Sequence, residues 1–182
     1  MTAKVGYGMA TGSLHDTYLS LGSNLSGPWG TPRDCLERAI CALEAAGLEI
    51  VARSPQYNTP PLGPRQPRFV NAVVRVRGGV PVSRLLRLAK SIERKAGRRQ
   101  RMIWGPRTLD IDVLMSGKVP YQWPFRRAGS ITLPHPELHR RAFVLVPLND
   151  IAPAWVHPRT GLTVRDMLRR RPAAERRGIA RF

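Results

Sequence analysis

The sequence has few cysteines, few acidic residues and no long apolar run. Its two cysteines, Cys35 and Cys41, lie in one predicted helix. Their spacing places them about 240° apart around the helix axis, so they cannot form a disulfide with each other. Two cysteines are also too few for a disulfide framework or a four-ligand zinc site, which predicts a reducing, cytoplasmic environment. No segment approaches about 18 consecutive apolar residues, which excludes a membrane-spanning helix.

Acidic residues are scarce: 12 Asp and Glu stand against 30 Lys and Arg, a net charge of +18 in 182 residues. Arg supplies 26 of these cations, and its planar guanidinium binds phosphate through paired hydrogen bonds. The charge therefore indicates a phosphate-bearing partner such as a nucleotide, a nucleic acid or an anionic membrane. A GC-rich genome that encodes many Arg codons explains the count equally well. The hydrophobic fraction of 42% excludes a mainly disordered chain.

The two ends of the chain differ from its middle. Residues 1–16 contain clustered glycines without a preceding strand or a following Gly-Lys-Ser/Thr, which predicts a flexible leader rather than a phosphate loop. Residues 17–164 show no linker or internal repeat, which predicts one domain. Residues 165–182 carry seven Arg against two acids and predict a basic helix followed by a solvated, partly frayed tail.

Hydrophobic periodicity predicts the order of strands and helices. Strands are expected where apolar and polar residues alternate, and helices where apolar residues recur every three or four positions. The predicted order is strand, helix, strand, strand, helix, strand, at residues 17–21, 31–46, 48–54, 69–77, 81–96 and 108–115. Shorter helices are expected at 143–151 and 163–170, with loops at 58–64 and 98–107. This order is that of a ferredoxin-like α+β domain, in which helices pack on an antiparallel sheet.

Two aspartates on the last predicted strand are the sharpest local feature. Residues two apart on a strand face the same way, so Asp110 and Asp112 project together. Their neighbours Leu109, Ile111 and Val113 then face the core. Two adjacent carboxylates repel each other unless a cation lies between them, and Mg²⁺ prefers such ligands together with substrate phosphates. An ordinary strand with a solvent-facing polar side shows the same alternation, so the pair alone leaves both interpretations open.

The loop before this strand is strongly basic. Residues 94–107, from the end of the predicted helix through this loop, contain no acid and six cations: Arg94, Lys95, Arg98, Arg99, Arg101 and Arg107. A phosphate chain needs metal on one side and donors on the other, so the loop and the aspartate pair together predict a polyphosphate site. Trp104 in the loop is either a core anchor or a lid that excludes water. His135, between two prolines, is either a structural loop histidine or a phosphate donor.

Five motifs follow one another along the chain. They are Tyr18-Leu19-Ser20-Leu21-Gly22-Ser23-Asn24-Leu25, Thr59-Pro60-Pro61-Leu62-Gly63-Pro64, Phe69-Val70-Asn71-Ala72, Trp104-Gly105-Pro106-Arg107-Thr108-Leu109-Asp110-Ile111-Asp112, and Leu133-Pro134-His135-Pro136 with Arg141 and Phe143. Together they resemble the 6-hydroxymethyl-7,8-dihydropterin pyrophosphokinases of folate biosynthesis. The resemblance implies a monomeric, cytoplasmic enzyme with a ferredoxin-like α/β/α three-layer fold and a mainly antiparallel sheet. It also implies transfer of the diphosphate group of ATP to the hydroxymethyl group of the pterin, with release of AMP.

The resemblance further implies roles for individual residues. The positions that match catalytic residues are Arg98, Arg107, Asp110 and Asp112, and the two aspartates match the carboxylates that bind two Mg²⁺ ions. Positions that bind ATP are matched by Leu86, Glu93, Arg98, Trp104, Arg107, Val113, Ile131, Thr132, His135 and Arg141. The pterin pocket is matched by Gly22, Thr59, Pro60, Pro61, Leu62, Phe69, Asn71 and Phe143. In this match the two phenylalanines lie on either side of the pterin ring.

The sequence departs from the family pattern at several points. Phe69 stands where Tyr is frequent, Pro136 where some members have an aromatic residue, and Ile103 where a basic residue is common. The loop that contains Arg99 and Arg101 is also one residue short. No role therefore follows from the resemblance for these two arginines.

A nucleic-acid-binding protein is the main alternative, and the charge of +18 favours it. Such modules place aromatic residues among the basic ones on a sheet face. Aromatics make up only 7% of this chain and form no such stripe, so neither specific nucleic-acid binding nor membrane binding is expected. A different nucleotide-dependent kinase would need a Walker-type loop, which the sequence lacks.

Overall fold

Groups of strands and helices follow one another along the described part of the chain. The computed structural model describes residues 15–99, 105–117, 121–125 and 129–182, with the backbone alone for 121–125 and 129–131. The strands are β1 (Thr17–Ser23), β2 (Ile50–Arg53), β3 (Tyr57–Thr59), β4 (Phe69–Val76), β5 (Asp110–Ser116), β6 (Tyr121–Phe125), β7 (Gly129–Leu133) and β8 (Ala180–Arg181). The helices are α1 (Pro32–Ala45), α2 (Val82–Lys95), α3 (Ala142–Ile151), α4 (Val164–Arg169) and α5 (Ala173–Arg177). A 3₁₀ turn, Leu138–Arg140, precedes α3. Within the part of the chain that is described, no helix is long and apolar enough to cross a membrane.

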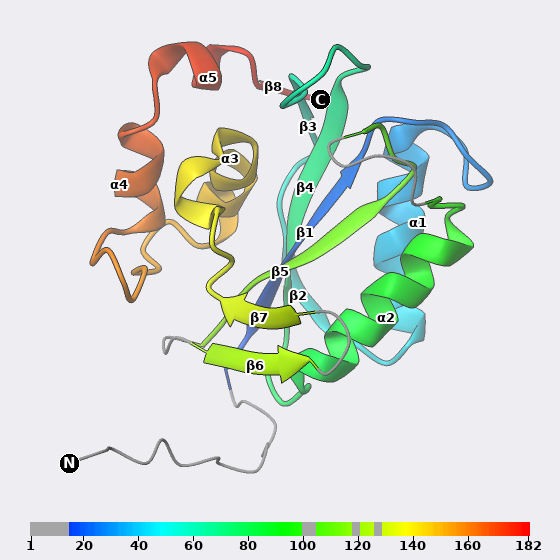
Figure 1. Ribbon diagram of the computed structural model, residues 1–182, viewed down its shortest axis with the longest axis horizontal. Coiled ribbons are helices and arrows are strands. Elements are labelled where there is room, and N and C mark those ends of the chain that lie inside the picture. The colour runs from blue at the N-terminus through cyan, green and yellow to red at the C-terminus, as the bar shows by residue number, and fades with distance from the viewer. Residues whose placement is uncertain (1–14, 100–104, 118–120, 126–128) are drawn as a thin grey trace.

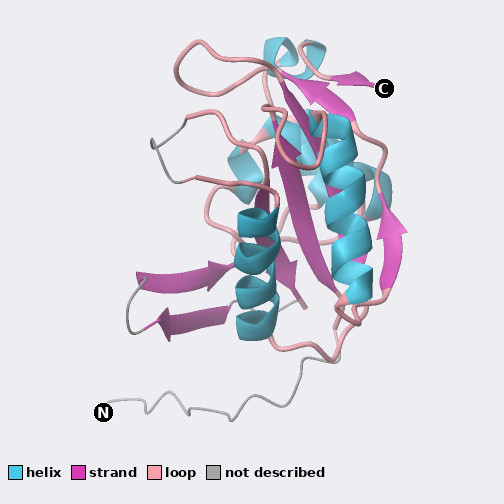
Figure 2. Ribbon diagram, turned by 90° about the vertical axis from the view of Figure 1, so that its right-hand side faces the viewer, coloured by secondary structure: helices cyan, strands magenta, loops and turns pink. Residues whose placement is uncertain are grey.

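The main sheet has the strand order β5-β1-β4-β3-β8, and β2 also pairs with β4. The neighbouring strands described here are antiparallel. In Figure 1, α1 and α2 cover one face of the sheet and α3, α4 and α5 lie on the other, while β6 and β7 form a separate hairpin. Figure 2 looks onto α1 and α2 and shows the hairpin projecting away from the sheet. The prediction of a three-layer, ferredoxin-like α+β domain is confirmed.

The sequence accounts for both ends of α1. Thr31 and Asp34 form a capping box: the Asp34 N–H donates to the Thr31 hydroxyl, and the Thr31 N–H donates to the Asp34 carboxylate. Pro32 occupies the first turn, where a missing N–H is not needed by the helix. The helix ends just before Gly47, whose φ of +85° strains any residue with a side chain. These local signals explain why the predicted and observed helix agree closely.

Two apolar clusters hold the three layers together. Between the sheet and the α1–α2 layer, Leu21 and Val74 pack against Leu36 and the surrounding helix residues. Between the sheet and the α3–α4 layer, Val73 packs with Leu145 and their neighbours. Adjacent residues of β4 thus enter different clusters, because side chains alternate across a strand. Helices cover both faces of the sheet, so polar side chains on either face are unexpected unless they serve a site.

The structure differs from the prediction at several places, and one of them is α5, which forms at Ala173–Arg177 where a tail is predicted. Tyr57–Thr59 forms β3 where a loop is predicted, the β6–β7 hairpin is not predicted at all, and Ala180–Arg181 forms β8 where a frayed tail is predicted. Strands of two or three residues are too short to show alternation, so only pairing with a neighbour defines them. The side chains of 165–182 are largely exposed, as expected, but the backbone joins the sheet. The predicted leader lies, up to residue 14, outside the described residues.

Candidate active site

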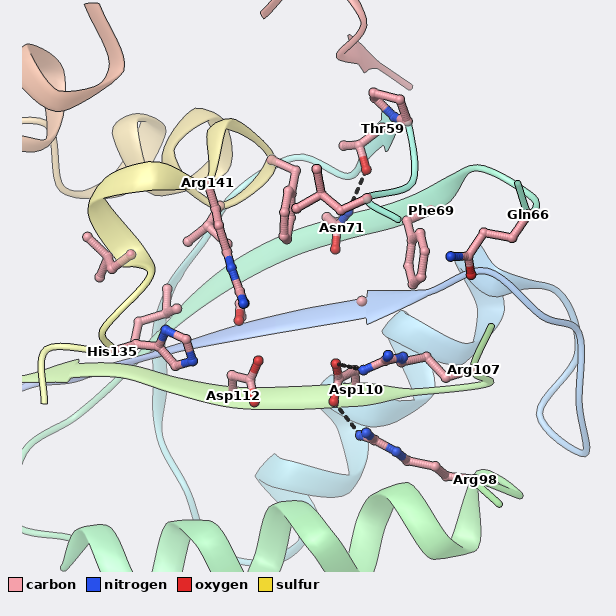
Figure 3. Close-up of a pocket in the computed structure, with 18 of the residues that line it drawn as sticks. Thr59, Gln66, Phe69, Asn71, Arg98, Arg107, Asp110, Asp112, His135 and Arg141 are labelled. Atoms are coloured by element: carbon pink, nitrogen blue, oxygen red, sulfur yellow. Dashed lines mark hydrogen bonds and ion pairs between the residues drawn. The ribbon is translucent and has the colours of Figure 1, made fainter. Parts of the chain in front are cut away.

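A cavity of about 430 Å³ opens on the sheet face that carries α3. It lies where β5, β1 and β4 run side by side. The strand register brings its polar residues together: Gly22 lies opposite both Asp110 and Asn71. One step along, Ser20 lies opposite Asp112. The cavity is therefore lined by residues from three neighbouring strands, as Figure 3 shows.

The cavity has two ends of different character. The charged end consists of Arg98, Arg107, Asp110, Asp112, His135 and Arg141. The neutral end consists of Gly22, Thr59, Pro60, Leu62, Phe69, Asn71 and Phe143. The structure thus brings together, in one cavity, most of the residues that the sequence singles out. Their individual roles stay predictions.

Asp110 is the most strongly paired carboxylate of the charged end. One of its oxygens forms an ion pair with Arg98, and the other lies 2.6 Å from Arg107 Nη1. Burial disfavours the charged form of Asp110, but the two guanidinium groups outweigh burial, so the pKa of this carboxyl is lowered. Asp110 is therefore ionised at neutral pH and already lies among cations.

A buried glutamate on α2, Glu93, holds the cations of the charged end in place. Its side chain is 3% exposed. It accepts hydrogen bonds from Arg98 Nη1 at 2.7 Å, from Lys90 Nζ at 2.9 Å and from the Ile111 N–H at 2.9 Å. A buried carboxylate needs such partners because it has lost its hydration. Glu93, predicted as an ATP contact, is not among the residues that line the cavity, but it contacts two of them, Arg98 and Lys90.

Asp112 lies in a different electrostatic environment from Asp110. Burial and repulsion from Asp110 raise the pKa of Asp112, and the charges of His135, Lys90 and Arg141 oppose this rise only in part. An additional cation would therefore stabilise the ionised pair. Mg²⁺ fits, since it binds one or two carboxylates and completes its shell with phosphate and water. Among the described residues, no group of three or more His, Cys, Asp and Glu could hold a metal ion.

His135 presents a neutral imidazole to the charged end. Burial lowers its pKa, although the charge of Asp112 opposes this. Its Nδ1 accepts a hydrogen bond from the Glu137 N–H at 3.1 Å, so the proton of the neutral ring is carried by Nε2. His135 N–H also donates to the Leu114 carbonyl at 2.7 Å, which ties this loop to β5. The ring is therefore a fixed donor beside Asp112, as Figure 3 shows.

The neutral end is organised around the amide of Asn71. Asn71 Nδ2 donates to Thr59 Oγ1 at 2.7 Å, and both side chains are buried. A Cβ on Gly22 would lie 2.7 Å from Asn71 Oδ1, so only glycine leaves room for the amide in this orientation. Phe69 from β4 and Phe143 from α3 line the same end. Aromatic faces and an oriented amide suit a flat ring with a polar edge.

Asn24 joins the loops that flank the cavity. Its side chain is buried, and Oδ1 accepts a hydrogen bond from the Arg107 N–H at 2.8 Å. Its Nδ2 donates to Gln66 Oε1 and to the Pro67 carbonyl, each at 3.0 Å. The loop that carries Arg107 is thereby fixed against the loop that precedes β4. The sequence motif contains Asn24, but sequence reasoning assigned it no role.

Some predicted residues lie away from the cavity. Val113 and Leu86 belong to the apolar cluster below the α1–α2 layer, because side chains alternate along β5 and Val113 faces away from Asp112. Thr132 and Pro61 are described but are not among the residues that line the cavity. Four positions singled out from the sequence lie outside the described residues, in whole or in their side chains: Arg101, Ile103, Trp104 and Ile131.

Six residues that the prediction omits also line the cavity. They are Ser20, Gln66, Lys90, Leu114, Leu138 and Val144. Ser20 and Leu114 lie two positions along a strand from predicted residues, so the strand period alone could have identified them. Lys90 lies about one helical turn before Glu93 and could have been found in the same way. The other three come from separate segments, and no local signal points to them.

The chain is similar in sequence to proteins of one family. The family model described as 7,8-dihydro-6-hydroxymethylpterin-pyrophosphokinase matches residues 18–153. A 2-amino-4-hydroxy-6-hydroxymethyldihydropteridine pyrophosphokinase of Synechocystis sp. is 38% identical over 151 residues, which are 82% of this chain and 73% of that protein. The protein of the same name from Pseudomonas aeruginosa is 41% identical over 142 residues, 77% of this chain and 82% of the other.

Solved structures share the fold. A crystal structure of a Plasmodium falciparum HPPK-DHPS variant with pteroate has a TM-score of 0.70 and 15% identity, over 92% of this chain and 46% of that one. The wild-type Plasmodium protein has a TM-score of 0.67 and 16% identity, over 87% and 41%. This chain spans less than half the length of these structural neighbours, and at such identity the likeness shows the fold alone. Because the family model matches most of its residues, the chain belongs to the 7,8-dihydro-6-hydroxymethylpterin-pyrophosphokinase family.

Proposed function

We propose that this chain transfers the diphosphate group of ATP to the hydroxymethyl group of 6-hydroxymethyl-7,8-dihydropterin and releases AMP, as a Mg²⁺-dependent, monomeric, cytoplasmic enzyme. Pyrophosphoryl transfer to this pterin, in folate biosynthesis, is the activity of the family, so the chain is a transferase. One observation carries the finer proposal: a single cavity joins a charged end suited to phosphates to a neutral end suited to a flat polar ring.

The charged end supports binding of a triphosphate. Arg98, Arg107 and Arg141 present guanidinium groups to the cavity, and such groups bind phosphate oxygens through paired hydrogen bonds. His135 adds a neutral donor through Nε2. Phosphoryl transfer is catalysed mainly by positioning and by neutralising charge, so this group of donors supplies the main requirement.

Asp110 and Asp112 are the residues that would hold Mg²⁺. When bound, the metal neutralises phosphate charge and lowers the pKa of a coordinated hydroxyl. The lowered pKa of Asp110 keeps it ready as a ligand at neutral pH. The pKa of Asp112 is raised, and only the ionised carboxylate binds a cation, so Mg²⁺ affinity is expected to fall as the pH falls.

The neutral end supports binding of the pterin. Phe69 and Phe143 offer aromatic faces to the ring. The Asn71 amide, held by Thr59, offers a carbonyl oxygen and N–H groups to the polar edge of the ring. A pterin held there points its hydroxymethyl group toward the two aspartates, since Gly22 separates Asn71 from Asp110 in the strand register.

The proposed step exchanges one phosphorus–oxygen bond for another. The hydroxymethyl oxygen of the pterin forms a bond to the β-phosphorus of ATP, and the bond from this phosphorus to the oxygen shared with the α-phosphate breaks. AMP leaves with that oxygen, and the hydroxyl proton passes to solvent. Both aspartates are committed to the cation, so we assign no side chain among the described residues as a general base.

Release of AMP tests this proposal directly. Purified protein with ATP, Mg²⁺ and 6-hydroxymethyl-7,8-dihydropterin should form AMP and the diphosphorylated pterin in equal amounts, and omission of the pterin or chelation of Mg²⁺ should stop both. Asp112→Asn, which keeps the shape of the side chain, should lower the rate about 10²-fold or more. Protein that binds both substrates but forms no AMP would refute catalysis, and AMP release without pterin would indicate idle hydrolysis.

A further inference from the structure

Residues 178–182 run along the outer edge of β3, the strand that ends in the neutral end of the cavity. Tyr57 pairs with Arg181 and Asn58 with Ala180. The Phe182 N–H donates to the Gln56 carbonyl at 3.1 Å. Figure 1 shows β8 beside β3, on the side of the sheet away from β5. A three-residue strand therefore has neighbours on both sides, which restricts its movement.

Arg68 links this segment to β3. Its Nε donates to Asn58 Oδ1 at 2.6 Å, and its Nη2 donates to the Asn58 carbonyl at 3.2 Å and to the Gly178 carbonyl. One guanidinium thus joins the loop before β4, strand β3 and the turn after α5. The rigid planar fork of Arg suits such a three-way contact, because several donors are fixed in one plane.

Residues 178–182 also contact α1, a helix of the α1–α2 layer. The Phe182 ring lies under the Arg33 guanidinium of α1, 4.6 Å from ring centroid to Cζ. Gln56, which accepts from Phe182, donates through Nε2 to Glu37 of α1 at 2.7 Å. The outer edge of β3 is therefore attached to α1 as well as to β8.

A displacement of β3 would change the cavity through two of its contacts. Thr59, its last residue, receives the Asn71 hydrogen bond that orients the amide of the neutral end. Pro60, which follows, lines the cavity, and a Cβ on Gly178 would come within 3.1 Å of Pro60 Cγ. The turn at Gly178 thus packs directly behind a wall of the cavity.

We propose that Arg68 and residues 178–182 act as a brace that positions Thr59, Pro60 and the Asn71 amide for pterin recognition. The brace rests on the proposed function, in which the neutral end binds the pterin. Arg68 is a positioning residue, since it acts through Asn58 and Thr59 and is not among the residues that line the cavity. Its loss should weaken recognition of the pterin and spare the charged end, which is built from other elements.

Arg68→Met tests the brace, because Met keeps an unbranched apolar stem and removes every donor. The matched control is Arg65→Met, an exposed arginine of the same loop. For Arg68→Met we expect KM for the pterin to rise about tenfold, as for the loss of one or two strong hydrogen bonds, with kcat and KM for ATP changed less than about twofold. Arg65→Met should leave kcat and both KM values unchanged. Arg68→Lys, which keeps the charge and part of the donors, should raise KM for the pterin less than Arg68→Met does.

A second variant, which lacks residues 180–182, removes β8 and Phe182 but keeps Arg68. It should raise KM for the pterin in the same selective way. Equal increases in KM for both substrates, together with a lower Tm, would make the segment merely structural and overturn the proposal. Unchanged pterin KM in both variants would overturn it as well.

Calorimetric titration of the pterin, in the presence of Mg²⁺ and a non-hydrolysable ATP analogue, separates this proposal from the proposed function. If the wild-type protein binds the pterin but releases no AMP, the proposed catalysis fails, and the ratio of Kd values between Arg68→Met and wild type still tests the brace. If the wild-type protein binds no pterin, the brace is overturned together with the pterin site.

Discussion

The two ends of the cavity are built in opposite ways. The charged end is made mainly by residues that lie close together in the sequence, and ion pairs around Asp110 and Glu93 hold it together. The neutral end is assembled from β1, β3, β4 and α3, and one amide–hydroxyl hydrogen bond between Asn71 and Thr59 lies at its centre. The charged end is therefore recognisable by its ionic residues and their closeness in the sequence. The neutral end depends on its shape and on pairing between distant segments.

This difference predicts that the two ends fail differently when altered. At the charged end, substitution of a carboxylate by a neutral side chain leaves cations without a partner. Electrostatic stabilisation of the transferred group is then weakened, and kcat falls. At the neutral end, a substitution disturbs complementarity to one substrate, so the loss falls on binding of that substrate. Substitutions that conserve shape test the contrast with the least disturbance of packing.

The largest effect is expected for Asp110→Asn. It removes the carboxylate that Arg98 and Arg107 share, and with it one proposed Mg²⁺ ligand. We expect kcat for AMP release to fall about 10²- to 10³-fold. Binding of the pterin should change little, since no pterin contact is altered. Glu44→Gln, at an exposed acid of α1, is the control, and a retained kcat in Asp110→Asn would refute the assignment of the charged end.

A smaller and more selective effect is expected for Asn71→Asp. The variant keeps the shape of the side chain but loses the donor to Thr59 and adds a negative charge to the neutral end. We expect KM for the pterin to rise about 10- to 100-fold while KM for ATP stays nearly constant, because a site built to hydrogen-bond one ligand loses mainly that ligand. Steady-state kinetics with each substrate varied in turn gives both constants. Equal increases would show that the two ends are not separable.

The smallest effect is expected outside both ends, at His157. This residue is 3% exposed and its ring lies 5.8 Å, between centroids, from the rings of His139 and Trp155. Burial lowers the pKa of His157, with the positive charges of its neighbours in support. The folded state then binds fewer protons than the unfolded chain, so stability is lost as the pH falls through the unfolded value of about 6.5.

Chemical denaturation at about pH 7.5 and about pH 5.5 measures this loss. His157→Gln should show a weaker dependence on pH than the wild-type protein, because it removes the titrating group. The result also separates the pH dependence of stability from the pH dependence of Mg²⁺ binding at the charged end. An identical slope in both proteins would show that His157 does not control acid stability.

Local signals explain which parts of the fold were predictable. The capping box at Thr31, the glycine after α1 and the alternation along β4 and β5 each act over a few residues, and each element agrees closely with its prediction. β3 and β8 carry no such signal, because only pairing defines them: β3 pairs with β4 and β8, and β8 pairs with β3. The frayed tail predicted for residues 165–182 was wrong at β8 for this reason: a basic, polar composition does not exclude backbone pairing.

The same division applies to the candidate site. A shared face for Asp110 and Asp112 follows from strand alternation alone, and the basic run before them is visible in the sequence. Glu93 shows the limit of that reasoning. Its contact with Lys90 follows helical spacing, but its contact with the Ile111 N–H requires α2 to pack against β5, and no spacing in the chain reveals that contact.

The sequence by itself determined the order of the main elements, the aspartate pair and the family resemblance, because each depends on residues a few positions apart or on contiguous motifs. Only the tertiary structure decided which residues meet across strands. Gly22 comes between Asn71 and Asp110, Glu93 accepts a hydrogen bond from the Ile111 N–H, and Gly178 comes to lie behind Pro60. Such meetings depend on register and on layer packing, which many distant residues determine together through burial and backbone pairing.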